Sequence, residues 1–428
     1  MLYASYQAQE DLLALWRSAA VAGGEVLRKL PVPLLEWPVM RTALAAAEIA
    51  PLTALRHTRP PFAIESVQVA GRLVAVHEEA LTGSAFGTLL HFAKTPHIDQ
   101  PRVVLLAPLS GHFATLLRET VRTMLPDQDV FISDWHNCRD APLADGAFGF
   151  DEYVEHVMSF LRAIGPGGHL VAVCQPVVQA LAATALMAAA EDPCQPRSLT
   201  LMAGPIDARA NPTAVNELAT SHPLDWFERN LIARVPARYP GAGRRVYPGF
   251  LQVAAFVSMN RSRHAAAFAN LFTDLIAQKH EKAAKTEEFY REYFAVLDLA
   301  AEFYLETVQR VFQEHRLASG ELRWRGELVD PRAIRRTVLL TVEGERDDIC
   351  GIGQTAAAQD LCSRIPLARR SHHLQAGVGH YGVFSGRRWE RDVYPVVRNA
   401  ILSGERSPRS AAKRPAHPEV HATRDPSG

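Results

Sequence analysis

The pattern of apolar and polar positions changes character twice along the chain. Up to about residue 60, apolar residues recur at helical spacing, for example over 12–16 and 44–55, and they predict a helical N-terminal segment. Between residues 65 and 92 the pattern turns into short alternating runs bounded by turn residues, which predicts a small antiparallel meander.

From residue 103 onward, short apolar runs alternate with helical patterns. Strands are predicted at 103–107, 129–133, 169–173 and 199–203, and helices at 113–125 and 153–164. Strands that are apolar throughout are covered on both faces, so these runs predict a largely parallel sheet with helices on both sides.

Between about 205 and 335 this alternation gives way to long helical patterns, at 264–280 and 287–312, and to many aromatic residues. We interpret this stretch as a lid inserted between two strands. The alternation then resumes with a strand at 337–342, a helix at 354–362, a strand at 372–375 and a last helix at 389–402. Residues 403–428 hold four prolines and almost no apolar side chains, which predicts a disordered tail.

Composition narrows the class of protein. The 428 residues are 48% hydrophobic with a formal net charge of +0, which allows a large core and argues against nucleic acid as the main partner. The five cysteines are irregularly spaced without a C-x-x-C pair, so neither a disulfide framework nor a zinc site is expected.

The N-terminus lacks the basic region of a signal peptide, and the longest apolar helical run, 176–190, is too short to span a bilayer. We expect a cytoplasmic protein without a membrane span.

No metal or cofactor is expected either. The chain has no H-E-x-x-H motif and no paired metal-ligand spacing. Gly351-Ile-Gly-Gln-Thr-Ala356 matches a dinucleotide-binding pattern, but several residues separate it from the preceding strand, whereas that motif needs the turn directly after the strand.

The first candidate for chemistry is Cys174, which follows the apolar run 169–173 and is followed at once by an Ala/Leu-rich helical run. This is the strand–nucleophile–helix turn of an α/β-hydrolase, with cysteine in place of serine. The helix N-terminus can stabilise a thiolate there. Ala172 and Pro176 replace the two glycines of the usual motif. By itself the residue could equally be a buried cysteine that only packs in the core.

Two further residues follow the nucleophile in the order that this fold requires, which is nucleophile, acid, histidine. Asp347 follows the strand predicted at 337–342, and His380 lies in a glycine-rich loop after the last predicted strand. Asp207, which follows an earlier strand, is the competing acid, and Asp347 and Asp348 together could simply begin the next helix. His372 and His373 fall within a strand pattern and are interpreted as packing or surface residues.

Ser110 lies just after the strand at 103–107, where this fold places part of its oxyanion hole. Backbone N–H groups near Ser110 and at Gln175 are the candidate donors. Ser110 is also the rival nucleophile, ranked below Cys174 because no helix follows it as directly. His112 is a candidate supporting residue.

Together these patterns predict an α/β-hydrolase fold, with a mostly parallel sheet, helices on both faces and a helical lid insertion. The expected division is an N-terminal helical segment at 1–60, the core at 61–204 and 336–402, the lid at 205–335 and the tail at 403–428.

Several segments carry a resemblance to a known family: Ala107-Pro-Leu-Ser-Gly-His112, Val173-Cys-Gln-Pro176, Arg244-Arg-Val-Tyr-Pro-Gly-Phe-Leu-Gln252 and Gly379-His-Tyr-Gly382. With these motifs the chain resembles the intracellular poly(3-hydroxybutyrate) depolymerases, cysteine-dependent relatives of the polyhydroxyalkanoate synthases. The resemblance spans nearly everything before the tail. It places the nucleophile on Cys174, the acid on Asp347 and the base on His380. Ala172 favours the depolymerases over the synthases.

The resemblance implies cleavage of poly(3-hydroxybutyrate) esters through a covalent thioester, at the surface of a polymer granule. Such a thioester can pass its acyl group to water or to coenzyme A. The lid aromatics Trp226 and Phe227 are the candidate substrate contacts. The alternatives are a synthase-type acyltransferase and a granule-associated protein without activity.

Overall fold

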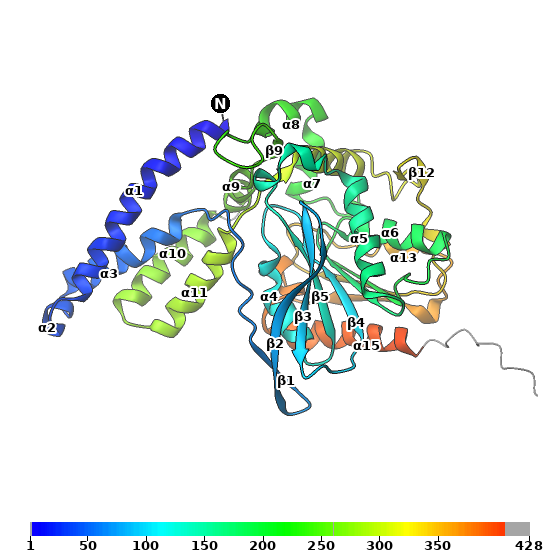
Figure 1. Ribbon diagram of the computed structural model, residues 1–428, viewed down its shortest axis with the longest axis horizontal. Coiled ribbons are helices and arrows are strands. Elements are labelled where there is room, and N and C mark those ends of the chain that lie inside the picture. Colours follow the sequence, from blue (N-terminus) through cyan, green and yellow to red (C-terminus); the bar gives the residue numbers. More distant parts are fainter. Residues whose placement is uncertain (1, 260, 407–428) are drawn as a thin grey trace, which may run out of the picture.

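The computed structural model describes residues 2–259 and 261–406, and at its centre lies a nine-stranded sheet (Figure 1). The strand order is β1-β2-β3-β5-β4-β6-β7-β13-β14. All neighbours from β5 to β14 are parallel, and β1, β2 and β3 form an antiparallel edge, so the predicted meander and parallel sheet are confirmed. The strands are β1 (Ser66–Val69), β2 (Arg72–Gly83), β3 (Gly87–Thr95), β4 (Arg102–Leu106), β5 (Asp129–Trp135), β6 (His169–Val173), β7 (Ser198–Met202), β13 (Val338–Gly344) and β14 (Arg370–Gln375).

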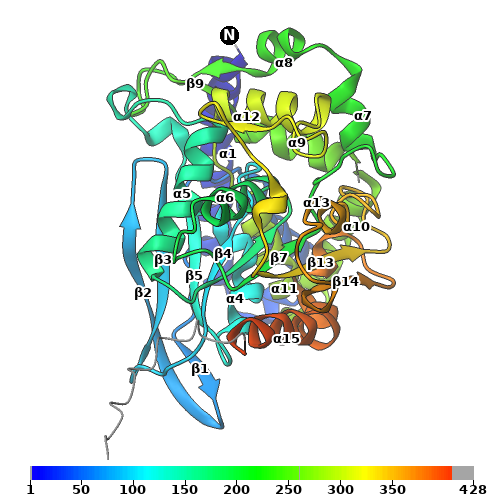
Figure 2. The same ribbon diagram turned by 90° about the vertical axis from the view of Figure 1, so that its right-hand side faces the viewer.

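Helices cover both faces of the sheet because successive residues of the buried strands point to opposite sides. Val104 and Leu106 of β4 belong to one core cluster, and Val103 and Leu105 to the other. The first cluster is completed by α5 (Phe150–Ile164) and α6 (Val177–Ala189), and the second by α4 (Arg118–Met124) and α15 (Tyr394–Glu405) (Figure 2).

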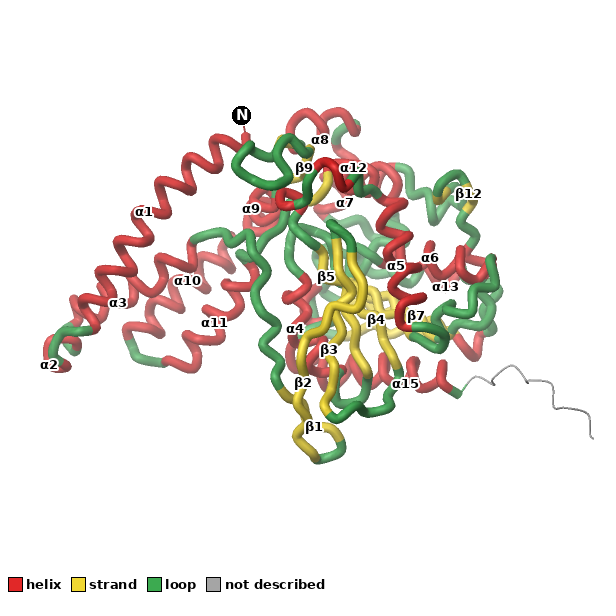
Figure 3. The backbone as a smooth tube through the Cα atoms, in the orientation of Figure 1, coloured by secondary structure: helices red, strands yellow, loops and turns green. Residues whose placement is uncertain are grey.

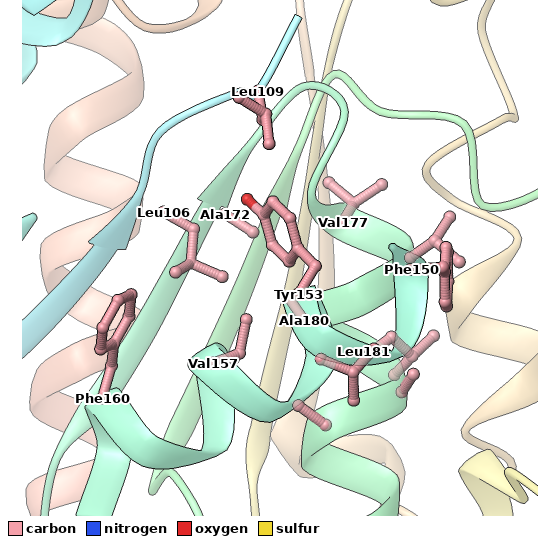
Figure 4. Packing of buried hydrophobic residues seen from close by; sticks show 14 of the residues in the cluster. Leu106, Leu109, Phe150, Tyr153, Val157, Phe160, Ala172, Val177, Ala180 and Leu181 are labelled. Atoms are coloured by element: carbon pink, nitrogen blue, oxygen red, sulfur yellow. The ribbon is translucent and has the colours of Figure 1, made fainter. Parts of the chain in front are cut away.

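The first core cluster supports the loop that follows β4. Tyr153 of α5 packs beneath Leu109, between β6 and the start of α6 (Figure 4). Its hydroxyl donates to the carbonyl of Ala107 at 3.3 Å, and the indole N–H of Trp135 donates to the same oxygen at 3.0 Å. Both groups are buried, so these bonds fix the end of β4 without water.

A long insertion separates β7 from β13. It comprises α7 (Ala214–Ser221), α8 (Leu224–Leu231), β8 (Ala233–Arg234), β9 (Arg245–Tyr247), α9 (Gly249–Met259), α10 (Arg261–Ile276), α11 (His280–Tyr293), β10 (Leu299–Ala300), α12 (Ala301–Thr307), a π-helical turn (Val308–Gln313), β11 (Arg323–Trp324) and β12 (Glu327–Leu328).

The single helix predicted at 287–312 is wrong, because α11 ends at Tyr293 and α12 begins only at Ala301. The chain between them is buried and pairs with other segments: Val296 forms a bridge to His112, and β10 pairs with β9. Tertiary pairing therefore overrides the local helical pattern. The helix predicted at 264–280 corresponds to α10, which begins at Arg261 and ends at Ile276; residue 280 already belongs to α11.

The helix predicted at 354–362 shrinks to α13 (Ala358–Leu361). Residues 352–357 form turns instead. The N–H groups of Thr355 and Ala356 donate to the buried Glu343 Oε1, at 2.7 and 2.9 Å, which ties these turns to β13.

The N-terminal helices α1 (Leu2–Arg28), α2 (Val32–Leu35) and α3 (Pro38–Ile49) form an arm beside the sheet together with α10 and α11 (Figures 1 and 3). The arm is tied to the insertion by Tyr3, whose hydroxyl donates to the buried Asp298 at 2.6 Å. The outer face of α1 leaves Leu12, Leu15 and Trp16 exposed.

The predicted start of the tail at 403 is too early. Helix α15 continues to Glu405, because its last turn packs Gly404 against β6 and the side chain of Glu405 contacts His169 at 3.0 Å. The rest of the predicted tail, 407–428, lies outside the described residues. Within the described part of the chain, no helix has the length and apolar character needed to cross a membrane.

Candidate active site

Cys174 stands at the sharp turn between β6 and α6, and its backbone is left-handed, with φ at +66°. Such a conformation is costly for a residue with a side chain and needs support from its surroundings. The N–H of Cys174 donates to the carbonyl of Met202 at 2.7 Å, which fastens the turn to the neighbouring strand. Of the five cysteines, Cys174 is the one that is not fully buried.

Gly204 provides the close packing that glycines within the turn usually provide. A Cβ atom on Gly204 would lie 2.1 Å from the carbonyl oxygen of Cys174 and 2.4 Å from Val177. Ala172 and Pro176 can therefore replace the usual glycines, because the space is made by the segment after β7 instead. The sequence analysis missed this residue, whose only signal was a glycine directly after a predicted strand.

The structure joins the predicted acid and base directly. His380 Nδ1 and Asp347 Oδ2 are 2.8 Å apart, with 6% of the histidine and 1% of the aspartate side chain exposed. The other carboxylate oxygen of Asp347 accepts the N–H groups of Ile349 and Cys350, both at 2.9 Å. Because Asp347 is thus held from both sides, it fixes the ring of His380 with Nδ1 as the donor.

The charges around His380 favour its protonated form. Burial lowers the pKa of His380, but the negative charges of Cys174 and Asp347, and the hydrogen bonds with both, outweigh it and hold this pKa well above its usual range. The charge of Asp347 and its hydrogen bond thus stabilise an imidazolium at His380.

The loop that carries Asp347 is fixed by Glu343, which is 1% exposed. Its two oxygens accept the N–H groups of Gly353, Thr355 and Ala356 at 2.7–2.9 Å. Sequence analysis gave Glu343 no role, because a glutamate within an apolar strand has no distinctive spacing; only its burial identifies it.

The competing candidates have other partners. Asp207 pairs with Arg209 at 2.8 Å, and this hydrogen bond holds the pKa of Asp207 below its usual range. Asp348 is exposed. His112 is buried, which lowers its pKa to about 4, and its ring N–H donates to the carbonyl of Tyr293 at 3.0 Å. His112 is therefore a neutral part of the cavity wall.

The proposed oxyanion donors lie beside the thiol. Ser110, Gln175 and Cys174 line one cavity. The N–H of Leu109 donates to the side-chain oxygen of Gln175 at 3.3 Å, so the loop after β4 is joined to the turn that carries Cys174. The oxyanion hole at Ser110 and Gln175 stays a prediction. His372 and His373 lie on β14, and His372 Nδ1 contacts the hydroxyl of Thr341 at 3.0 Å.

The cavity over Cys174 has a volume of about 300 Å³ and is lined mostly by apolar side chains. The insertion supplies part of its wall, including Phe227, Phe256 and Phe303. Among the described residues, Phe227 lines this cavity and Trp226 does not; Trp226 stacks on His222 with ring centres 4.1 Å apart. Of the two predicted lid contacts, only Phe227 thus faces the thiol cavity.

A second cavity, of about 630 Å³, adjoins the first and shares Phe256, Ile349, His380 and Tyr381 with it. Its wall is more polar and includes Arg263, Lys285 and Arg346. Within the described part of the chain, no group of three His, Cys, Asp or Glu side chains is arranged to hold a metal ion.

The parallel sheet, the turn at Cys174 and the order Cys174, Asp347, His380 along the chain define an α/β-hydrolase, which confirms the predicted fold class. Residues 203–404 match the family model described as the PHB de-polymerase C-terminus. This part of the chain is thus similar to the C-terminal domain of PHB depolymerases. The matched stretch includes Asp347 and His380, whereas Cys174 precedes it.

Solved structures with a similar fold include a 2-hydroxy-6-oxo-6-phenylhexa-2,4-dienoate hydrolase from Rhodococcus, with 12% identity, 77% of this chain and 99% of that chain covered, and a TM-score of 0.43. An epoxide hydrolase from Bacillus megaterium has 13% identity, 79% and 99% coverage, and a TM-score of 0.42. The thioesterase domain of the curacin biosynthetic pathway has 12% identity, 77% and 99% coverage, and a TM-score of 0.41. No curated protein matches this chain.

We predict that Gly204→Ala weakens both the fold and the site, because the added methyl group meets the carbonyl of Cys174 at 2.1 Å. Overpacking of this kind costs about 1–3 kcal/mol of unfolding free energy. Thermal denaturation and the rate of Cys174 alkylation measure the effect. Gly23→Ala is the control, since nothing lies within 4 Å of a Cβ at that position. Unchanged stability and thiol reactivity in Gly204→Ala would contradict the packing role.

We predict that Asp347→Asn lowers turnover by roughly ten-thousandfold, because His380 would be held in the wrong tautomer. The pH profile should change as well. The imidazolium is present below the pKa of His380 and lost as pH rises through it, and the Asp347 charge raises that pKa. Its removal should shift the alkaline limb of kcat/KM to lower pH.

Asp348→Asn is the matched control for Asp347→Asn and should have a mild effect on turnover. If Asp348→Asn slowed turnover more than Asp347→Asn, the assignment of the acid would be wrong. An Asp347→Asn profile with an unmoved alkaline limb would remove its electrostatic role.

Proposed function

We propose that this protein hydrolyses ester bonds of poly(3-hydroxybutyrate) through a thioester on Cys174. The matched family and the hydrolase fold support an ester hydrolase. The observation that carries the finer proposal is the alignment of Cys174, His380 and Asp347 beneath a largely apolar cavity. A methyl-substituted polyester fits such a cavity better than a charged or heavily hydroxylated polymer does.

The reaction begins with the thiolate of Cys174 and the imidazolium of His380. The thiolate attacks the ester carbonyl carbon, and backbone N–H groups at Gln175 and near Ser110 stabilise the oxyanion that forms. The carbon–oxygen bond to the leaving group then breaks, and His380 gives its proton to the departing 3-hydroxyl oxygen. The acyl chain remains as a thioester on Cys174.

Water completes the cycle. His380, now neutral, takes a proton from a water molecule as that water attacks the thioester carbonyl. Collapse of this second tetrahedral state releases the acid and returns the thiolate–imidazolium pair. Asp347 stays ionised throughout and stabilises the positive charge on His380. Because the intermediate is a thioester, a thiol such as coenzyme A is chemically able to replace water as the acceptor.

The first test is Cys174→Ala, which should remove hydrolysis of amorphous polymer granules while leaving the fold intact. Loss of a triad nucleophile costs on the order of a millionfold in turnover, whereas loss of one oxyanion donor costs roughly a hundredfold, so Ser110→Ala should lose far less. Wild-type activity in Cys174→Ala would overturn the mechanism.

Two further measurements separate the alternatives. Alkylation with iodoacetamide should modify Cys174 and inactivate the enzyme, while Cys350→Ser, which changes a buried thiol, should not alter the labelling. Incubation with 3-hydroxybutyryl-coenzyme A should release free acid. Polymer formation in that assay would instead support a synthase-type acyltransferase.

We also propose that the lid, residues 205–335, binds the polymer granule, and a second test addresses this. We expect Trp226→Ala to weaken granule binding more than it slows cleavage of a short soluble ester, because its ring is only partly buried. Phe227→Ala should impair both and lower thermal stability, since this side chain is 2% exposed and lines the cavity.

Trp16→Ala is the control for Trp226→Ala, since Trp16 is 59% exposed on α1 and belongs to the arm, not to the lid. If Trp16→Ala reduced granule binding and Trp226→Ala did not, the lid would be excluded as the granule-binding surface.

A further inference from the structure

The second cavity, which adjoins the thiol cavity at His380, differs from it in chemistry. Three cationic side chains line it, from three separate segments: Arg263 on α10, Lys285 on α11 and Arg346 in the loop after β13. Asp348 is the one carboxylate in its wall. The thiol cavity has mainly apolar walls, so the two cavities suit different parts of one substrate.

The three cations are available to a ligand. On the same two helices, Lys282 pairs with Asp274 at 2.8 Å and Arg291 pairs with Glu287 at 3.1 Å. The ion pairs of the described residues, such as these two, include none of Arg263, Lys285 and Arg346. An anion in this cleft would therefore find three positive charges, opposed within the described wall by the charge of Asp348.

The two cavities adjoin each other at His380. Both are bordered by His380 and Tyr381, whereas Cys174 is in the wall of the thiol cavity and not in that of the second cavity. The acyl part of the ester becomes bonded to Cys174, and the leaving alcohol takes its proton from His380. The acyl chain therefore belongs in the apolar cavity, and the leaving fragment departs along His380 toward the cationic cleft.

The leaving fragment of a linear 3-hydroxyacid polyester always contains the carboxyl end of the chain, and its carboxylate lies close to His380 only when this fragment is short. We propose that the cleft of Arg263, Lys285 and Arg346 binds this terminal carboxylate, so that the enzyme releases short hydroxyacid units from the carboxyl end. This inference rests on the proposed function and specifies which end of the polyester the same site recognises.

The test compares two soluble substrates of equal length with the full-length protein: the 3-hydroxybutyrate trimer as free acid and its methyl ester. The wild type should have a lower KM for the free acid, and added salt should reduce the difference because exposed charges are screened. The triple change Arg263→Gln, Lys285→Gln and Arg346→Gln should raise the KM for the free acid by roughly tenfold, since each exposed charge contact contributes only a few-fold.

The readout is the ratio of the two KM values, methyl ester over free acid. The triple variant should bring this ratio close to one, whereas Lys282→Gln, on α11 but outside the cleft wall, should leave it as in the wild type. Equal KM values for the two substrates in the wild type would overturn the inference and leave the proposed function standing. An unchanged ratio in the triple variant would also overturn it. Cleavage of neither trimer, together with no granule hydrolysis, would refute the proposed function itself.

Discussion

The left-handed backbone at Cys174 is the constraint on which the site depends. It lifts the thiol off the end of β6 and starts α6 at once, and it is stable only because its surroundings hold it. Gly204 leaves room for the carbonyl of Cys174, and the carbonyl of Met202 accepts its N–H. Cys174 is thus positioned by the neighbouring strand β7 and the segment after it as much as by its own strand. A turn without its usual glycines is possible because a glycine stands just after the neighbouring strand instead.

Asp347 and His380 are held in place by the hydrogen bonds of buried carboxylates, and not by an α-helix or a strand. Glu343 collects three backbone N–H groups of the loop after β13, and Asp347 collects two more before it bonds to His380. Each carboxylate accepts hydrogen bonds from backbone N–H groups that would otherwise be buried without an acceptor. These hydrogen bonds fix the loop although it contains little helix. A histidine that must lie beside a thiol requires such a fixed support.

The two cavities that adjoin at His380 would give the proposed reaction a direction. In that proposal the apolar cavity over Cys174 holds the part of the ester that becomes bonded to sulfur, and the cationic cleft receives the part that leaves with a proton from His380. The insertion contributes to both, since α9, α10 and α11 carry residues of their walls. A segment that interrupts the sheet in sequence thus determines what can approach the catalytic residues in space.

The sequence by itself was sufficient for the parallel sheet, the turn at Cys174 and the pairing of Asp347 with His380. These features follow from local patterns: uniformly apolar strands, a strand that meets a helix at a thiol, and the fixed order of the catalytic residues in this fold. The tertiary structure decided the rest. It ended α11 at Tyr293 because the following residues pair with distant segments, and it tied the turns before α13 to Glu343 through backbone N–H groups. Gly204 and the cationic cleft also emerged only there, since their roles depend on residues that are far apart in the chain and meet only when it folds.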